Sequence, residues 1–129
     1  MKRVLVDSSV WISYFKDENA HTKLTGLIKN NQICTNNLIL AELVPYLHAK
    51  SQIDIIDLLI ELPTTPLSIN WEFIINLQIR NIHNGINGVG IPDLMIIDNV
   101  VGNGLILYTE DKHFALINEH FRFDLFGVN

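Results

Sequence analysis

The chain alternates short, unbroken apolar runs with longer stretches in which apolar residues recur at helical spacing. An unbroken run such as VLV, which ends at Asp7, is typical of a parallel strand buried on both faces. The pattern predicts strands at residues 3–7, 32–35, 65–69, 105–109 and 121–126, the last of them at an edge. Strands that alternate with helices favour an α/β fold, in which one α/β/α domain encloses a mainly parallel central sheet of four to five strands.

The helical stretches carry start and stop signals. They cover residues 10–15, 24–30, 38–50, 53–62, 71–82, 93–102 and 110–119. Asn36 or Asn37 can cap the third helix, and Asn70 can cap the fifth. Pro45 should kink the third helix, because its ring removes one backbone hydrogen bond. Pro92 suits the first turn of the sixth helix, which follows a glycine-rich loop.

Length and composition limit the class of protein. The 129 residues fit one domain spanning 1–129, and 48% of them are hydrophobic. A single cysteine, Cys34, allows no intrachain disulfide, so we expect a reducing, cytoplasmic location. No uncharged apolar run approaches the roughly 20 residues needed to span a bilayer, and the start is too polar for a signal peptide. We therefore expect a soluble protein with no membrane partner.

The formal net charge is −5, from 14 acidic against 9 basic residues. Proteins that hold nucleic acid mainly by charge are normally basic. By itself this balance argues against a nucleic-acid partner, unless a group of the acids has a specific task.

Four acids stand out by position. Asp7 and Asp111 follow predicted strands, Asp93 lies in the first turn of a predicted helix, and Glu42 lies inside the apolar segment LILAELVPYL. Taken singly, each of the three aspartates is explained as well by a structural role, as a helix cap or as an acid that favours the helix dipole, as by a functional role. Glu42 is harder to explain that way, because an unpaired carboxylate among buried residues is costly.

Taken together, the four acids predict a cation site. The carboxyl ends of parallel strands meet at one edge of the sheet. Two carboxylates about 4 Å apart repel by roughly 4 kcal/mol at intermediate dielectric, so such a cluster needs a cation. Oxygen ligands select Mg²⁺ or Mn²⁺. Zinc is not expected, because the five histidines and Cys34 show no ligand spacing.

Four motifs give the chain a resemblance to the PIN domain, and more closely to ribonuclease toxins of the VapC type. They are VLVDSSVWI, AEL, IPDLMII and YTEDKHF, in the order and approximate spacing of that family. The resemblance implies a PIN-like fold over the whole chain. It also implies a Mg²⁺-dependent endoribonuclease that hydrolyses RNA with an activated water and leaves a 5′-phosphate and a 3′-hydroxyl.

The resemblance assigns roles to the acids. The catalytic tetrad falls on Asp7, Glu42, Asp93 and Asp111. Asp7 and Asp93 resemble the principal metal ligands, and Asp111 completes the site directly or through water. Glu42 positions or deprotonates the attacking water.

Two hydroxyl residues match the positions that support the acids in the family. Ser9 corresponds to a hydroxyl that hydrogen-bonds the first aspartate, and Thr109 to the hydroxyl two residues before the last acid. Asp98 departs from the family, which usually has small residues there. It lies about 140° around the helix from Asp93, so we expect it to face solvent or an interface rather than to bind the ion.

The resemblance also implies partners. These are an RNA substrate and a small antitoxin that inserts an Arg or Lys into the acidic pocket. The apolar helical stretches, independently of the resemblance, could supply a face for a homodimer, which we expect, but composition does not locate it. Without the tetrad, ten acids face nine bases, so the negative charge is largely the site itself. The bases near the motifs are Arg80, Lys112, His113, His48 and Lys50. We expect them to be ordinary solvated charges, so that RNA is recognised by shape.

Three other classes of protein share parts of this pattern. A haloacid-dehalogenase-type phosphatase needs a second aspartate where this chain has Ser9. A receiver domain needs paired acids near the first strand and a lysine after the last strands, and neither is clear. The remaining alternative is a non-catalytic PIN-like module that binds RNA or protein, and the complete tetrad argues against it.

Overall fold

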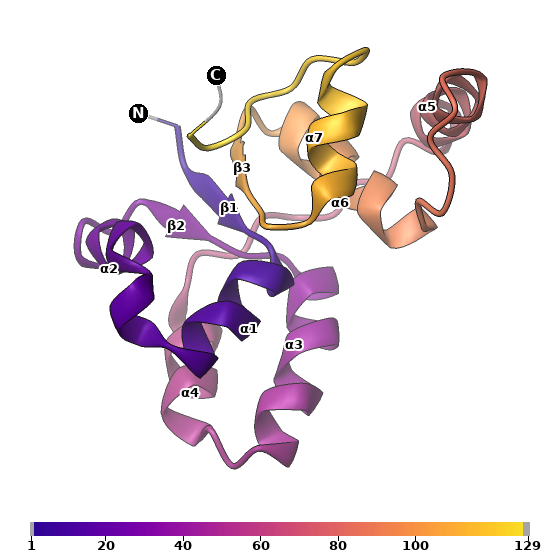
Figure 1. Ribbon diagram of the computed structural model, residues 1–129. Helices are drawn as coiled ribbons and strands as arrows, with labels where there is room; N and C mark the ends of the chain where they lie inside the picture. The colour runs from indigo at the N-terminus through magenta and orange to yellow at the C-terminus, as the bar shows by residue number, and fades with distance from the viewer. Residues whose placement is uncertain (1, 128–129) are drawn as a thin grey trace.

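Three parallel strands lie at the centre of the computed structural model, which describes residues 2–127 (Figure 1). They are β1 (Val4–Val6), β2 (Ile33–Cys34) and β3 (Ile106–Tyr108), in the order β2-β1-β3. Val6 pairs with Tyr108, so β1 and β3 end side by side. The α/β class with a parallel sheet is confirmed.

Helices cover both faces of this sheet (Figure 1). They are α1 (Ser8–Lys16), η1 (Glu18–Ala20), α2 (Thr22–Lys29), α3 (Asn37–Ala49), α4 (Ile53–Glu61), α5 (Trp71–His83), α6 (Ile91–Gly102) and α7 (Lys112–Asn118). Val4 and Val6 pack into a cluster with residues of α1 to α4, whereas Leu5 packs into a second cluster with residues of α5 to α7. The unbroken apolar run of β1 therefore serves two cores, one on each side of the sheet.

Two predicted strands do not form. The strand predicted at 65–69 is reduced to an isolated bridge between Thr35 and Thr64. Pairing stops there because Pro66 has no N–H to donate, and its carbonyl accepts a hydrogen bond from the Asn99 amide instead. The edge strand predicted at 121–126 is likewise one bridge, between Leu107 and Leu125. The described sheet therefore has three strands, not four or five.

The helix caps decide an alternative that the sequence left open. The side chain of Asn36, not that of Asn37, accepts the Ile39 N–H at 2.9 Å and caps α3. Asn70 caps α5 in the same way. α3 continues through Pro45 without ending. Among residues 2–127 there is no helix long and apolar enough to cross a membrane.

Asp98 ties two helices together. Its Oδ2 accepts the backbone N–H of Asn70 at 2.9 Å, which fixes the start of α5 against α6. The residue is partly buried at this contact between helices, and among the described residues it is not part of the group of possible metal ligands, which agrees with the expectation that it faces solvent or an interface rather than the ion.

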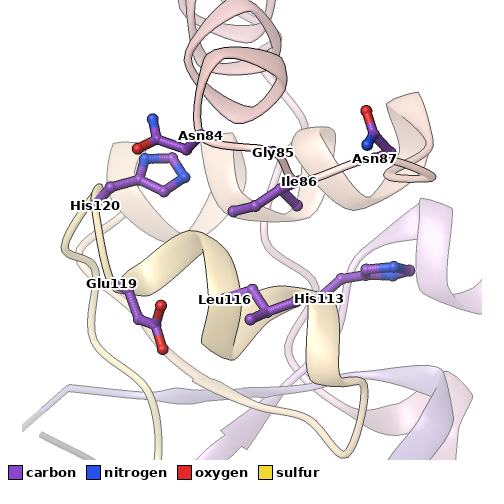
Figure 2. Close-up of a pocket in the computed structure, with 8 residues that line it drawn as sticks. All are labelled: Asn84, Gly85, Ile86, Asn87, His113, Leu116, Glu119 and His120. Atoms are coloured by element: carbon purple, nitrogen blue, oxygen red, sulfur yellow. The ribbon is translucent and has the colours of Figure 1, made fainter.

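A cavity lies where the loop between α5 and α6 passes α7. It has a volume of about 640 Å³, and residues from the loop and from one face of α7 line it (Figure 2).

The buried Asn36 offers a test of the packing between layers. Its amide also donates to Asn99 Oδ1 at 3.0 Å. We expect Asn36→Ala to lower the free energy of unfolding by about 2–3 kcal/mol, because α3 loses its cap and Asn99 loses a buried partner. The matched control is Asn37→Ala, at the exposed neighbour, which should cost less than about 0.5 kcal/mol. Urea denaturation measures both, and equal losses would contradict the assignment of the cap.

Candidate active site

The acidic residues meet at the carboxyl ends of β1 and β3. Asp7 follows β1 directly and donates its backbone N–H to Tyr108 O at 2.9 Å. The chain leaves β1 toward β2 on one side and reaches β3 on the other, so this edge is the switch point of the sheet. Sites in parallel α/β folds form at such points.

Asp7 is not a side-chain helix cap. It occupies the N-cap position of α1, yet its carboxylate makes no capping hydrogen bond. Oδ2 instead accepts from Ser9 Oγ and from Thr109 Oγ1, each at 2.9 Å. Two donors occupy Oδ2, and no described contact reaches Oδ1. Asp7 is only 5% exposed, so the orientation of its carboxylate is fixed.

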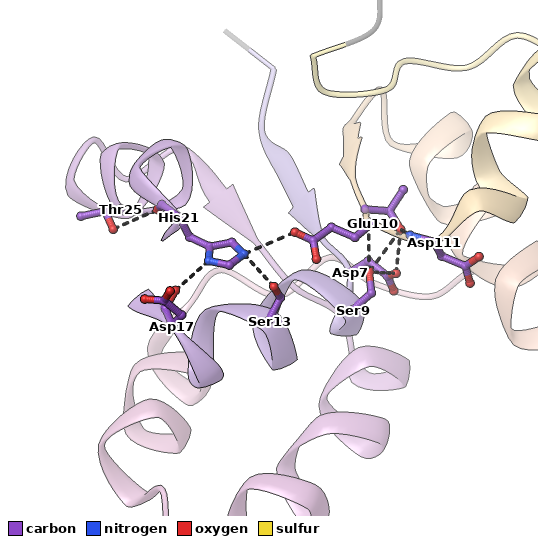
Figure 3. Close-up of polar contacts among 9 residues, drawn as sticks. Asp7, Ser9, Ser13, Asp17, His21, Thr25, Glu110 and Asp111 are labelled. Atoms are coloured by element: carbon purple, nitrogen blue, oxygen red, sulfur yellow. Dashed lines mark hydrogen bonds and ion pairs between the residues drawn. The ribbon is translucent and has the colours of Figure 1, made fainter. Parts of the chain in front are cut away.

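The two hydroxyls also hold the loop that follows β3 (Figure 3). Ser9 Oγ accepts the N–H of Glu110, and Thr109 Oγ1 accepts the N–H of Asp111, each at 3.0 Å. Each hydroxyl therefore donates to Asp7 and accepts from the loop, and the direction of its proton is set. The backbone of Asp111 is fixed relative to Asp7 by this pair.

Glu110 is directed away from Asp111, toward His21 (Figure 3). His21 Nε2 lies 3.3 Å from Glu110 Oε2 and 2.8 Å from Ser13 Oγ, and Nδ1 donates to Asp17 O at 2.9 Å. This contact keeps the Glu110 carboxylate out of the acidic cluster.

Asp93, Asp111 and His113 form a group suited to a cation. One ligand atom from each lies within 4.8 Å of the others. Asp93 comes from the first turn of α6 and Asp111 from the N-cap of α7, where Asp111 Oδ1 accepts the His113 N–H at 2.9 Å. Asp111 therefore does cap α7, as one interpretation of the sequence predicted, and the capping hydrogen bond orients its carboxylate within the group.

Glu42 approaches from α3 and is exposed, so the expectation of an acid buried among apolar neighbours is wrong. The apolar residues around it face the core on the other side of the helix. Desolvation raises the pKa of Glu42, and the nearby carboxylates of Asp7 and Asp93 raise it further.

The pKa of Asp93 is affected by the same acids. Burial raises its pKa, the charges of Asp111 and Asp7 add to the rise, and His113 opposes it. Asp93 therefore interacts electrostatically with each of the other three acids named from the sequence. Among the described residues, however, the group whose ligand atoms lie within 4.8 Å includes Asp111 but not Asp7 or Glu42.

His113 is the site residue that sequence reasoning missed. The sequence placed it among solvated bases, and the metal set was expected to hold oxygen only. The signal was the Asp-x-His spacing of Asp111 and His113 at a helix start. Two carboxylates and an imidazole can hold a divalent cation: the carboxylate oxygens suit Mg²⁺ or Mn²⁺, whereas an imidazole nitrogen favours later transition metals such as Zn²⁺.

Comparison with known proteins supplies the family. A family model described as "PIN domain" matches residues 4–119. The chain belongs to the PIN domain family. A search of curated protein sequences finds no match.

Solved structures share the fold of this PIN domain. A chain of the DNA-bound VapBC complex from Salmonella typhimurium has a TM-score of 0.75 at 16% identity, covering 97% of each chain. VapBC2 from Rickettsia felis, bound to a promoter DNA fragment, gives 0.68 at 20% identity and covers 95% of this chain and 96% of that one. PAE2754 from Pyrobaculum aerophilum gives 0.60 at 13% identity, with 90% and 86% covered. At these identities the likeness concerns the fold alone.

The other bases named from the sequence lie at the surface of the PIN domain. Arg80 lies over the Phe121 ring, 5.9 Å from its centroid, and donates to His120 O. Lys112, His48 and Lys50 are exposed.

The raised pKa values of Asp93 and Glu42 predict a pH dependence. The folded PIN domain binds protons at these two sites more tightly than the unfolded chain does. Its stability therefore falls as the pH rises from about 4, the usual carboxyl pKa, through the raised values, and stays lower above them. We expect metal-free Asp93→Asn to melt at a higher temperature than the wild type near pH 7. The difference should vanish near pH 3 and shrink when a divalent cation is added.

Circular dichroism melts in EDTA, with and without added Mn²⁺, measure this effect. Asp57→Asn, at an exposed acid on α4, is the matched control and should change the melting temperature little. A lower melting temperature for metal-free Asp93→Asn at neutral pH would contradict the proposed repulsion.

Proposed function

We propose that this PIN domain is a divalent-metal-dependent endoribonuclease. The observation that carries the proposal is the fixed carboxylate of Asp7, with Oδ2 taken by two hydroxyls and Oδ1 left free beside the other acids. Hydrogen bonds to one carboxylate oxygen orient the other, which is how supporting residues prepare a carboxylate to bind a metal ion. PIN domains are generally nucleases, which agrees with this reading.

In this proposal each side chain of the site has a separate role. Asp7, Asp93, Asp111 and the added His113 hold the cation, which, when bound, orients the phosphate and lowers the pKa of a water. Glu42 accepts the proton of that water, since a raised carboxyl pKa makes a better base near neutral pH. Ser9 and Thr109 keep Asp7 in place. Attack on phosphorus breaks the bond to the 3′-oxygen, which takes a proton from solvent and leaves as a hydroxyl, and the phosphate stays on the 5′ side.

Mg²⁺ is the expected cation and Mn²⁺ the alternative. The alternative function is a non-catalytic module that binds RNA or protein through the same fold, and it requires no ordered carboxylate.

We also propose that the chain is the toxin of a toxin–antitoxin pair. Two of its structural relatives are VapBC complexes. A small antitoxin would inhibit the site by inserting an Arg or Lys among the acids, where it finds unpaired carboxylate oxygens.

A homodimer completes the proposal. Four large apolar residues of α5 are each at least 50% exposed: Trp71, Ile75, Ile79 and Ile82. Their spacing places them on one side of the helix. A continuous apolar row on one helix can pair with its own copy across a two-fold axis. We assign this row to the contact between two copies.

Asp7→Asn tests the enzyme. The variant keeps the shape of the side chain and removes its charge, so we expect RNA cleavage to fall by at least about 100-fold, with the fold retained by circular dichroism. Expression of the wild type should arrest bacterial growth, and expression of Asp7→Asn should not. Asp57→Asn is the matched control and should behave as the wild type. Full cleavage by Asp7→Asn would rule out the proposed site.

Ile79→Glu tests the dimer. A charge in the middle of the apolar row should make the chain monomeric in sedimentation experiments, because the carboxylate would be buried at the contact. Ile60→Glu is the control, since Ile60 is 63% exposed but lies on α4. A wild type that is already monomeric, or an Ile79→Glu variant that remains dimeric, would contradict this assignment.

A further inference from the structure

The cavity beside α7 adjoins the candidate metal centre. His113 lines the cavity and also belongs to the metal-binding group with Asp93 and Asp111. Leu116 of α7 and then Glu119 and His120, which follow the helix directly, continue the lining from His113, so the cavity runs from the metal group past the end of α7 (Figure 2). A polymer whose phosphate lies at the metal group would place a neighbouring unit in this space. Its volume of about 640 Å³ falls in the range of small-ligand sites.

The lining suits a flat, neutral ligand with hydrogen-bond donors. Ile86 and Leu116 offer apolar surface. Glu119 offers a carboxylate, and Asn84 offers its carbonyl oxygen and one N–H, since the other N–H of its amide is donated to Arg80 O at 2.7 Å. None of the lysines and arginines within residues 2–127 lines the cavity. A phosphate would meet a carboxylate there and no cation, so the cavity is not a phosphate site.

His120 closes one end of the cavity. Its ring lies beside Asn84, at the end opposite His113 (Figure 2). Both ring nitrogens are shielded from solvent, so a ligand in the cavity would meet the ring surface of His120 rather than hydrogen-bond to its nitrogens.

We propose that this cavity binds one unpaired nucleobase of the RNA, next to the phosphate that is cleaved. The inference rests on the proposed ribonuclease function. Sequence-specific binding of RNA uses unstacked bases that stack on aromatic rings and hydrogen-bond through their edges. The acceptors Glu119 and Asn84 select a base that carries an exocyclic amino group, and a carboxylate pairs well with the amino group of cytosine. Uracil lacks that group and is disfavoured.

Two substrates that differ only in the exocyclic amino group of one base test its contribution to recognition. Single-stranded RNA oligonucleotides are made with cytosine or uracil at the positions flanking one cleavable bond, and kcat/KM is measured for each. We expect the wild type to prefer the cytosine substrate by about tenfold and Glu119→Gln to lose most of that preference. Glu61→Gln, at an exposed acid on α4, is the matched control and should keep the preference.

Leu116→Trp gives a second variant. Leu116 is 43% exposed, so a larger side chain there fills the cavity without disturbing the core. KM for the cytosine substrate should rise in this variant. Equal cleavage of both substrates by the wild type, or a preference that neither Glu119→Gln nor Leu116→Trp alters, would overturn the proposal.

A binding experiment in the absence of cleavage tests the base site separately from the proposed ribonuclease activity. In EDTA, NMR titration of the labelled wild type with cytidine should shift the signals of Asn84, Asn87 and His120 more than uridine does. These shifts without any RNA cleavage would support the base site and refute the nuclease. Cleavage without cytidine-dependent shifts at these residues would refute the base site and leave the nuclease standing.

Discussion

One oxygen of Asp7 joins the two halves of the site. Its Oδ2 accepts from a hydroxyl in the first turn of α1 and from another directly after β3, and both hydroxyls accept backbone N–H groups of the next loop. Each hydroxyl proton and each backbone N–H in this network has one acceptor, so the loop that carries Asp111 is held in one orientation. The position of each remaining acid relative to Asp7 follows from the sheet and from this small network.

The electrostatics of the cluster then determine what it can bind. Burial and mutual repulsion raise the pKa values of Asp93 and Glu42, which shows that the folded chain holds these charges at a cost. A divalent cation removes that cost, and His113 supplies a nitrogen among the oxygens. With few bases nearby, RNA would be held by the cation and by base contacts in the adjoining cavity, rather than by a basic surface.

The layered fold is what brings these residues together. Alternate residues of β1 face opposite cores, so α1 and α3 are placed on one side of the sheet and α6 and α7 on the other. The site lies at the edge where both layers meet, and each layer supplies acids to it. The cavity belongs to the second layer, beside α7, which explains why His113 takes part in both the metal group and the cavity.

The sequence by itself determined the strands with unbroken apolar runs, the helices with strong caps and the four acids, because these depend on local chemistry. It was wrong at residues 65–69 and 121–126, where a proline and competing side-chain contacts decide how far pairing extends. Only the tertiary structure decided that Asp7 caps nothing while Asp111 caps α7, that Glu42 is exposed, and that His113 lies among the acids. The orientation of Asp7 depends on Thr109, which is 102 residues away in the chain. The meeting of Asp93 with Asp111 and His113 depends on how α6 and α7 pack, and no local pattern encodes that packing.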